Sequence, residues 1–110
     1  MQKELKERWI AALRSGEYKQ GRNYLNKDGG LCCLGVLCEV MELPKYEEDY
    51  EGGTITIYSD AARALPPSEV MDKQGLYQYW ATLASMNDNI DNQAPFTEIA
   101  DWIEENIPSE

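Results

Sequence analysis

Residues 34–43 form an almost uninterrupted apolar segment, which constrains the fold more than any other part of the chain. Only Glu39 and Glu42 interrupt it, and they would face solvent. Pro44 makes it unfavourable for a helix to continue beyond residue 43. A helix of about 10 residues with this pattern needs cover on most sides, since each buried Leu or Val contributes about 1.5–3 kcal/mol. The pattern predicts a buried central helix, in which Gly35 marks close packing against a neighbour.

Three cysteines lie in or beside this segment, in a chain that contains no histidine. On one helix, Cys33 and Cys38 would be separated by roughly 9 Å, beyond the roughly 7 Å that a disulfide can bridge. Cys32 is adjacent to Cys33, so the three thiols lack the paired ligand spacing of a zinc site. We therefore expect free, packed thiols, no bound metal and no cofactor.

The missing histidine excludes Cys-His and Ser-His-Asp catalysis. One enzymatic alternative stays open, because a helix that begins near Leu34 could lower the pKa of the Cys32 or Cys33 thiol. A carboxylate from Asp28 or Asp88 would then assist the thiolate. The apolar neighbours favour burial, so we expect that the protein is not an enzyme. The odd number of cysteines, without an export signal or a long apolar run, predicts a protein of the reducing cytoplasm.

Amphipathic helices are predicted near both ends of the chain. The first spans residues 3–14 and ends at Gly16, and its apolar face consists of Leu5, Trp9, Ile10 and Leu13. The second opens at Pro95 or Phe96 and runs to about Asn106. Its apolar face consists of Phe96, Ile99, Ala100, Ile103 and Ile107. Both helices therefore need a core to cover one side.

Strand patterns occupy the middle of the chain. Residues 23–26 and 31–33 predict a short hairpin that is closed by the turn Lys27-Asp28-Gly29-Gly30. Residues 54–58 alternate with period two and predict a strand with Ile55 and Ile57 on one face. Residues 44–53 are expected to form an acidic surface loop, because they end in Gly52-Gly53 and carry the carboxylates Glu47, Glu48, Asp49 and Glu51.

Two shorter helical pieces are predicted at residues 68–73 and 82–86, and the aromatic residues between them are expected to join the core. A length of 110 residues suits one domain. We therefore expect a single α+β domain over residues 1–110. Its N- and C-terminal amphipathic helices and buried central helix would pack on a short antiparallel hairpin or sheet.

Charge is distributed unevenly along the chain, whose net charge is −10. Residues 1–30 carry seven basic and four acidic residues, a net charge of +3. Residues 31–110 carry three basic and sixteen acidic residues, a net charge of −13. Direct binding to nucleic acid is disfavoured, because phosphate neutralisation needs a broad basic face. Two kinds of partner remain: a compact anion held by a small basic patch, or a basic protein surface that meets the acidic residues.

Groups of motif residues are spread over most of the chain, apart from residues 44–53. They are Trp9–Gly16 with Tyr18 and Gln20-Gly21; Cys32–Cys38; Leu65-Pro66 with Val70 and Gly75-Leu76; Leu83 with Asn87-Asp88; and Phe96 with Ile99-Ala100-Asp101 and Ile103-Glu104. Together they resemble an uncharacterised family of small bacteriophage and prophage proteins, although Pro95 stands where that family commonly has Ser or Thr. The resemblance implies a small protein made in the cytoplasm of a bacterial host, and it brings no catalytic residues.

That context implies an accessory protein that acts by binding and counteracts a bacterial host defence. It would sequester an anionic nucleotide signal, for which the candidate ligands are Tyr18, Lys19, Arg22, Tyr24 and Lys27. Alternatively, it would occupy a basic surface of a host defence protein with the acids of residues 47–51 or 98–105. A cysteine-dependent enzyme, a minor virion or assembly protein, and assembly into a homo-oligomer stay open. No membrane partner is expected.

Overall fold

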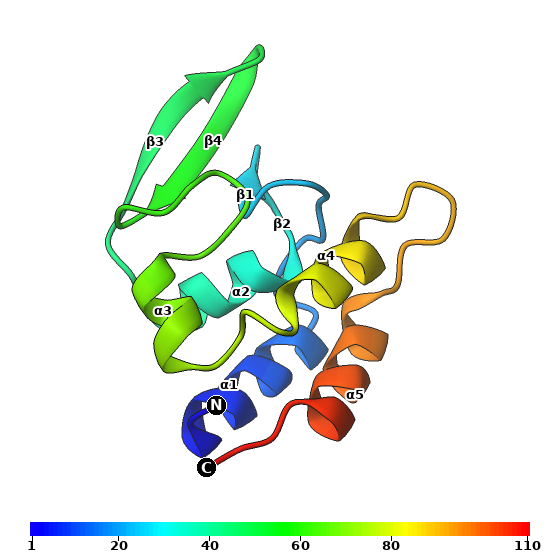
Figure 1. The fold of residues 1–110 in the computed structure, drawn as a ribbon. Coiled ribbons are helices and arrows are strands. Elements are labelled where there is room, and N and C mark those ends of the chain that lie inside the picture. The colour runs from blue at the N-terminus through cyan, green and yellow to red at the C-terminus, as the bar shows by residue number, and fades with distance from the viewer.

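A computed structural model describes all of residues 1–110 and contains five helices and a four-stranded antiparallel sheet (Figure 1). The helices are α1 (Lys3–Arg14), α2 (Cys33–Val40), α3 (Ser68–Lys73), α4 (Trp80–Asp88) and α5 (Phe96–Asn106). The strands are β1 (Asn26–Lys27), β2 (Gly30–Leu31), β3 (Lys45–Tyr50) and β4 (Gly53–Tyr58). This arrangement confirms the predicted α+β class.

Helix α2 lies at the centre of the helical layer, and every residue from Cys33 to Cys38 is buried. Helices α1 and α4 pack against it, and α5 lies beside both of these (Figure 1). The Trp9 side chain is fully buried, and its indole Nε1 donates a hydrogen bond of 2.9 Å to the Cys33 carbonyl. The predicted central helix is therefore confirmed. It ends at Val40 rather than near residue 43, and Glu42 adopts a positive φ of 54°.

The two ends of the chain meet beside α1 and α5 (Figure 1). The Met1 amino group donates to the Pro108 carbonyl at 3.0 Å, and the Glu110 N–H donates to the Met1 carbonyl at 2.9 Å. Both amphipathic helices bury the predicted faces against the same core. None of the five helices has the length and apolar character that would be needed to cross a bilayer.

The sheet has the strand order β2-β1-β4-β3 and contains two tight hairpins. Asp28 and Gly29 connect β1 to β2 with φ angles of 52° and 83°. Two successive residues with positive φ are the mark of a type I′ turn, whose twist matches that of the paired strands. The predicted hairpin forms, but its strand bounds were wrong: Lys27 and Gly30, predicted for the turn, lie in the two-residue strands, whereas residues 23–25 and 32–33 do not.

The prediction of a loop for residues 44–53 is wrong in its secondary structure. Strand β3 pairs with β4 along its whole length, from Lys45 opposite Tyr58 to Tyr50 opposite Gly53. The connecting turn again has two positive φ angles, 50° at Glu51 and 78° at Gly52. The segment is mostly exposed, as expected for an acidic stretch. Charged residues have low strand propensity, but they are common on edge strands, where they discourage unwanted pairing.

Candidate functional site

The β3–β4 hairpin has two chemically different faces, because successive side chains of a strand point to opposite sides. Ile55 and Ile57 share one face, here called the isoleucine face. Residues that lie directly opposite each other on paired strands share a face, so the register assigns the other face as well. This second face, here called the threonine face, consists of Lys45, Glu47, Asp49, Thr54, Thr56 and Tyr58.

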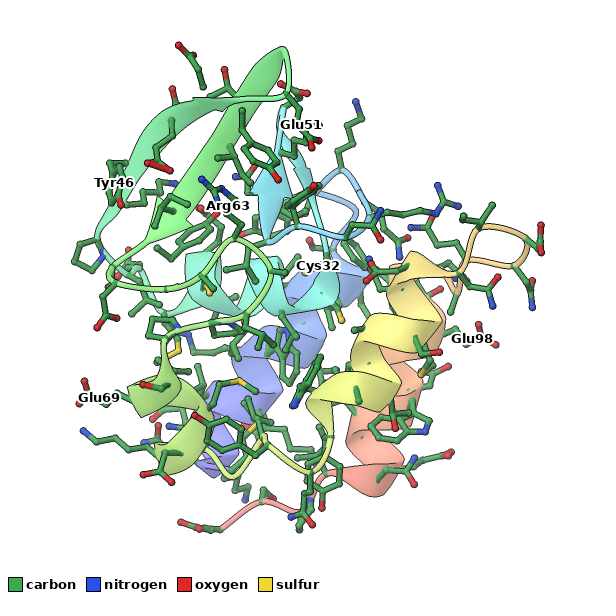
Figure 2. All side chains as sticks on the ribbon, turned by 45° about the horizontal axis from the view of Figure 1, so that its top comes forward. Cys32, Tyr46, Glu51, Arg63, Glu69 and Glu98 are labelled. Atoms are coloured by element: carbon green, nitrogen blue, oxygen red, sulfur yellow. The ribbon has the colours of Figure 1, made fainter.

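The isoleucine face is closed by a cluster of cationic and aromatic side chains. The Tyr24 and Tyr50 rings meet edge to face, with centroids 5.6 Å apart. Lys27 Nζ lies 5.4 Å from the Tyr24 centroid, and the Arg63 guanidinium carbon lies 4.4 Å from the Tyr50 centroid. Arg63 belongs to the segment that follows β4, and Figure 2 shows it beside the hairpin. Such stacking stabilises the packing of the hairpin on the rest of the chain.

Both cations of this cluster already have carboxylate partners. Lys27 Nζ lies 3.7 Å from a Glu51 oxygen, and an Arg63 guanidinium nitrogen lies 3.8 Å from a Glu48 oxygen. These exposed pairs are weak, each worth about 0–1 kcal/mol, but they cancel the local positive charge. An anionic ligand would therefore have to compete with Glu48 and Glu51 for the two cations.

The five candidate ligands of an anionic nucleotide do not all enter this cluster. Tyr24 and Lys27 do, whereas the Tyr18 side chain packs against the main core. Lys19 is exposed, and its backbone carbonyl accepts the Leu31 N–H at 2.8 Å. Arg22 Nε donates to the Asn89 carbonyl at 3.4 Å. Of the five predicted ligands, the fold therefore brings only Tyr24 and Lys27 together.

The four acids predicted for residues 47–51 are divided by the strand alternation. Glu48 and Glu51 are the partners of the two cations described above. Glu47 and Asp49 lie together on the threonine face, and neither has an ion-pair partner. Two residues along a strand are separated by roughly 7 Å. The hairpin therefore presents a pair of exposed, unneutralised carboxylates on one face.

The acids of α5 are also divided. Arg14 lies 2.7 Å from an Asp101 oxygen and 3.4 Å from a Glu104 oxygen, so α1 neutralises the middle of this helix. Glu98 and Glu105 are exposed and have no such partner. Glu98 lies on the far side of the molecule from the hairpin (Figure 2). The last helix therefore offers isolated charges rather than a continuous acidic surface.

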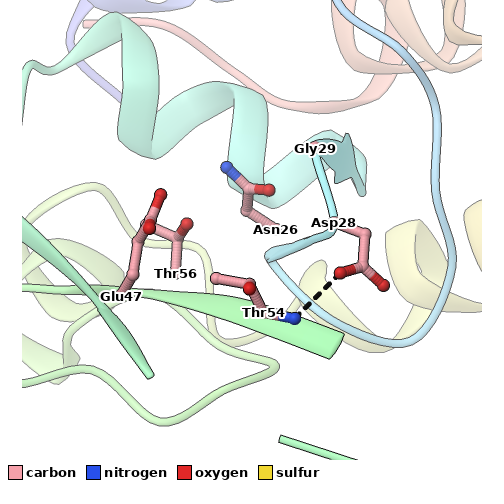
Figure 3. Close-up of a pocket in the computed structure, with 6 residues that line it drawn as sticks. All are labelled: Asn26, Asp28, Gly29, Glu47, Thr54 and Thr56. Atoms are coloured by element: carbon pink, nitrogen blue, oxygen red, sulfur yellow. Dashed lines mark hydrogen bonds between the residues drawn. The ribbon is translucent and has the colours of Figure 1, made fainter. Parts of the chain in front are cut away.

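A polar hollow of about 370 Å³ lies on the threonine face beside the β1–β2 turn (Figure 3). It is lined entirely by polar residues and glycine: Asn26, Asp28, Gly29, Glu47, Thr54 and Thr56. Asp28 Oδ1 accepts the Thr54 N–H at 2.8 Å, and the Asp28 N–H donates to the Thr54 carbonyl at 2.8 Å. These two bonds fix the Asp28 carboxylate at one side of the hollow. Its lining contains two carboxylates and no cationic side chain.

A hydrogen-bonded network continues the threonine face toward α2. The Tyr58 hydroxyl donates to Glu39 at 2.6 Å and accepts from Asn26 Nδ2 at 3.1 Å, and Lys45 Nζ donates to Glu39 at 2.8 Å. Partial burial raises the Glu39 pKa, but the donors Lys45 and Tyr58 outweigh it, so this pKa is lowered overall. Glu39 is therefore ionised at neutral pH, and it neutralises the only cation of the threonine face.

All three cysteines are buried and free, as predicted. Burial raises the pKa of the Cys32 thiol to about 11 and that of Cys38 to about 12, and it raises the pKa of Cys33 as well. Cys32 is the N-cap residue of α2, where the helix dipole favours a thiolate, but desolvation outweighs this effect. The thiols are consequently protonated at neutral pH and poorly suited to nucleophilic attack.

Two of the motifs noted in the sequence bind each other. Asn87 is fully buried, and its Nδ2 donates to the Gly21 carbonyl at 2.9 Å, while its Oδ1 accepts from Gln20 at 3.0 Å. Gln93 Nε2 donates to the Gly21 and Asn87 carbonyls at 3.1 and 2.8 Å. The Gln20-Gly21 and Asn87-Asp88 motifs thus have a structural role, since they tie the segment before α5 to the chain that leads into β1.

Sequence reasoning missed Glu39, Tyr50, Tyr58 and Arg63 as parts of these polar clusters. The available signal for Tyr50 was the period-two spacing of Tyr46, Glu48 and Tyr50 within a run of charges. Arg63 lies in the irregular segment after β4, and no local pattern indicates that it folds back over Tyr50. Such contacts depend on the path of the chain through space rather than on spacing.

Of three comparisons with known proteins, one finds a match, to a family model. No curated protein and no solved structure matches the chain. A family model described as a domain of unknown function, DUF8296, matches residues 1–107. This range includes all five helices and all four strands. The chain therefore belongs to the DUF8296 family.

Proposed function

We propose that the protein acts by binding and that the acidic hairpin β3–β4 occupies a basic surface of a partner protein. The observation that carries this proposal is the exposed pair Glu47 and Asp49, which stays unneutralised because Lys45, the only cation of the threonine face, is already paired with Glu39. The hairpin projects away from the helical layer, so a partner can reach this face (Figure 1). Clustered charge of one sign steers an oppositely charged partner and accelerates association.

The biological context of this proposal rests on the resemblance to phage proteins alone. In that context the partner is a host defence protein, and the place of action is the cytoplasm of the bacterial host. Sequestration of an anionic nucleotide has less support, because Lys27 and Arg63 are paired with carboxylates and the hollow is acidic. Catalysis by a cysteine also has less support, because burial keeps the three thiols protonated.

Affinity capture with matched charge variants tests the proposal. Tagged wild-type protein should recover a basic protein from a bacterial lysate, and moderate salt should release it. The double variant Glu47→Gln with Asp49→Asn should lose this protein. The control pair Glu98→Gln with Glu105→Gln removes the same charge from α5 and should retain it. Equal recovery by both double variants would show that net charge, and not the hairpin, is responsible.

A thermal shift panel separates this proposal from nucleotide sequestration. A ligand at 100 times its Kd stabilises the folded protein by about 2.7 kcal/mol. For a chain of this length such a change raises the Tm by roughly 10 °C. We expect no shift with cyclic or ADP-ribose-type nucleotides. A clear shift with one of them would replace the proposed function with sequestration.

A further inference from the structure

The polar hollow on the threonine face is rich in hydrogen-bond acceptors and poor in donors. Asp28 uses one carboxylate oxygen to accept the Thr54 N–H, which leaves its second oxygen without a partner. The Glu47 side chain makes no hydrogen bond or ion pair within the chain. Asn26 donates a side-chain N–H to the Tyr58 hydroxyl, and its side-chain carbonyl oxygen has no partner. A ligand that fits this inventory must supply several donors and positive charge.

Thr56 gives a second and independent indication of a ligand site. Its side chain is only 8% exposed, and its hydroxyl has no hydrogen-bond partner within the protein. No fully buried polar side-chain atom of the chain lacks a partner, so the Thr56 hydroxyl must open onto the hollow that it lines. In Figure 3 the side chains of Thr56 and Glu47 stand next to each other and point in the same direction. The hydroxyl therefore offers a free donor and free acceptor positions to a ligand in the hollow.

The cations of the chain itself do not fill the hollow. Lys45 lies on the same face, but its ammonium group is held by Glu39 at 2.8 Å. Lys27 and Arg63 lie with Glu51 and Glu48 around the tyrosine cluster. The volume of about 370 Å³ is at the lower end of the roughly 300–1,000 Å³ that small-ligand pockets span. The hollow can therefore take one side chain from outside.

We propose that this hollow is a socket for a guanidinium group, an arginine side chain that the basic partner presents. A guanidinium carries five N–H donors in a planar fork and no acceptor, which suits a site lined by the Asp28 and Glu47 carboxylates with the Thr56 hydroxyl beside Glu47. An ammonium group has three donors at one point and cannot reach both carboxylates equally well. The proposal rests on the proposed function, because the arginine belongs to the same basic partner.

An NMR titration with short capped peptides tests the socket without knowledge of the partner. The probes are tri-arginine, tri-lysine and the neutral tri-citrulline. Tri-arginine should cause saturable shifts of the backbone signals of Gly29, Thr54 and Thr56 and of the Asn26 side-chain amide. Tri-lysine should bind at least about threefold more weakly than tri-arginine, and tri-citrulline should cause no shift. Equal binding of tri-lysine, or shifts spread over all acidic surfaces, would overturn the socket.

Two substitutions in the hollow distinguish specific binding of arginine from a general effect of negative charge. Thr56→Val keeps the shape and the net charge but should weaken tri-arginine binding roughly threefold, with no fall in Tm, because an unpartnered hydroxyl is removed. Glu47→Gln should weaken binding roughly fivefold, the equivalent of an exposed ion pair. Glu105→Gln removes the same charge from an exposed position of α5 outside the hollow and is the matched charge control. An unchanged Kd in Thr56→Val would overturn the role of Thr56 and the socket.

The outcomes for the socket and for the proposed function can be distinguished. If Thr56→Val still binds tri-arginine normally while the double hairpin variant loses its basic protein, the hairpin is a binding surface and the hollow is not a socket. If tri-arginine occupies the hollow but no basic protein depends on Glu47 and Asp49, the socket stands and the proposed function fails.

Discussion

Replacement of Gly35 by alanine should destabilise this protein, although the same change stabilises most helices. In a helix interior, alanine is favoured over glycine by about 1 kcal/mol. Here a Cβ on residue 35 would overlap the carbonyl oxygen of Leu25. It would also lie 2.8 Å from the carbonyl carbon of Leu25 and 3.2 Å from the Cα of Leu25. Carbon atoms in contact are normally about 3.5–4.0 Å apart. Helix α2 or the Leu25 backbone must therefore move.

Neither side can move without breaking other contacts. The Leu25 N–H donates to the Arg63 carbonyl at 2.8 Å, and the Leu25 carbonyl accepts the Cys32 N–H at 3.3 Å. On the other side, α2 is enclosed by α1 and α4. Overpacking typically costs about 1–3 kcal/mol, and a clash with backbone atoms lies in the upper part of this range, about 2–3 kcal/mol, so the net loss after the helix-propensity gain is about 1–2 kcal/mol. For 110 residues, this corresponds to a Tm lower by roughly 4–9 °C.

Urea unfolding and thermal melts of Gly35→Ala measure this loss, and Ala11→Gly provides the matched control. Ala11 is exposed in the middle of α1, where the change to glycine removes helix propensity without any steric effect. The control should lose about 1 kcal/mol. Gly35→Ser should be at least as harmful as Gly35→Ala. If Gly35→Ala melts at or above the wild-type temperature, α2 does not touch Leu25 and the packing argument is refuted.

Four further predictions concern the cysteines, Glu39 and Asn87. The cysteines should resist iodoacetamide at pH 8 in the native protein and react only after unfolding in guanidinium. Because their folded pKa values are raised above the ordinary 9.0, the native state keeps protons that the unfolded state releases, so stability should fall by roughly 1 kcal/mol per thiol between pH 8 and pH 10 in urea titrations. The Glu39 pKa is lowered, so its stabilisation is present above pH 4.5 and lost at lower pH; Glu39→Gln should therefore lose less stability than wild type between pH 5 and pH 3. Asn87→Ala should lower the free energy of unfolding by about 1–3 kcal/mol and should speed proteolysis near the exposed Ile90.

The helices were predictable because their signals are local. Apolar residues at helical spacing, together with Gly16 and Pro44 as stops, placed all five helices, with ends that differ by a few residues. The Asp28-Gly29 turn was predictable for the same reason, since two adjacent residues fix its shape. Helix α4 began two residues before its predicted start, because Trp80 is already held by the Leu76 carbonyl.

The candidate site was predictable only in part. Acidic residues near 47–51 and basic residues near 22–27 were visible as composition, but pairing and alternation decide which of them carry unneutralised charge. Arg63, in the segment after β4, neutralises Glu48, and Lys27 of β1 neutralises Glu51. No cation pairs with Glu47 or Asp49 on the other face. The hollow depends on the contact between the β1–β2 turn and β4, which pairs Lys27 with Ile55. No short-range pattern encodes that contact.

The charged residues of β3, which are atypical of a strand, also restrict what can bind to its free edge. Strand β3 is the last strand of the sheet, so one side of its backbone has no strand partner. If a second copy paired antiparallel over the full strand, Glu47 of one copy would lie opposite Glu48 of the other, and like charges directly opposite each other are destabilising. A basic extended segment would meet complementary charges at the same positions. The acidic edge thus discourages self-association through β3 and favours the kind of partner that the hollow is proposed to recognise.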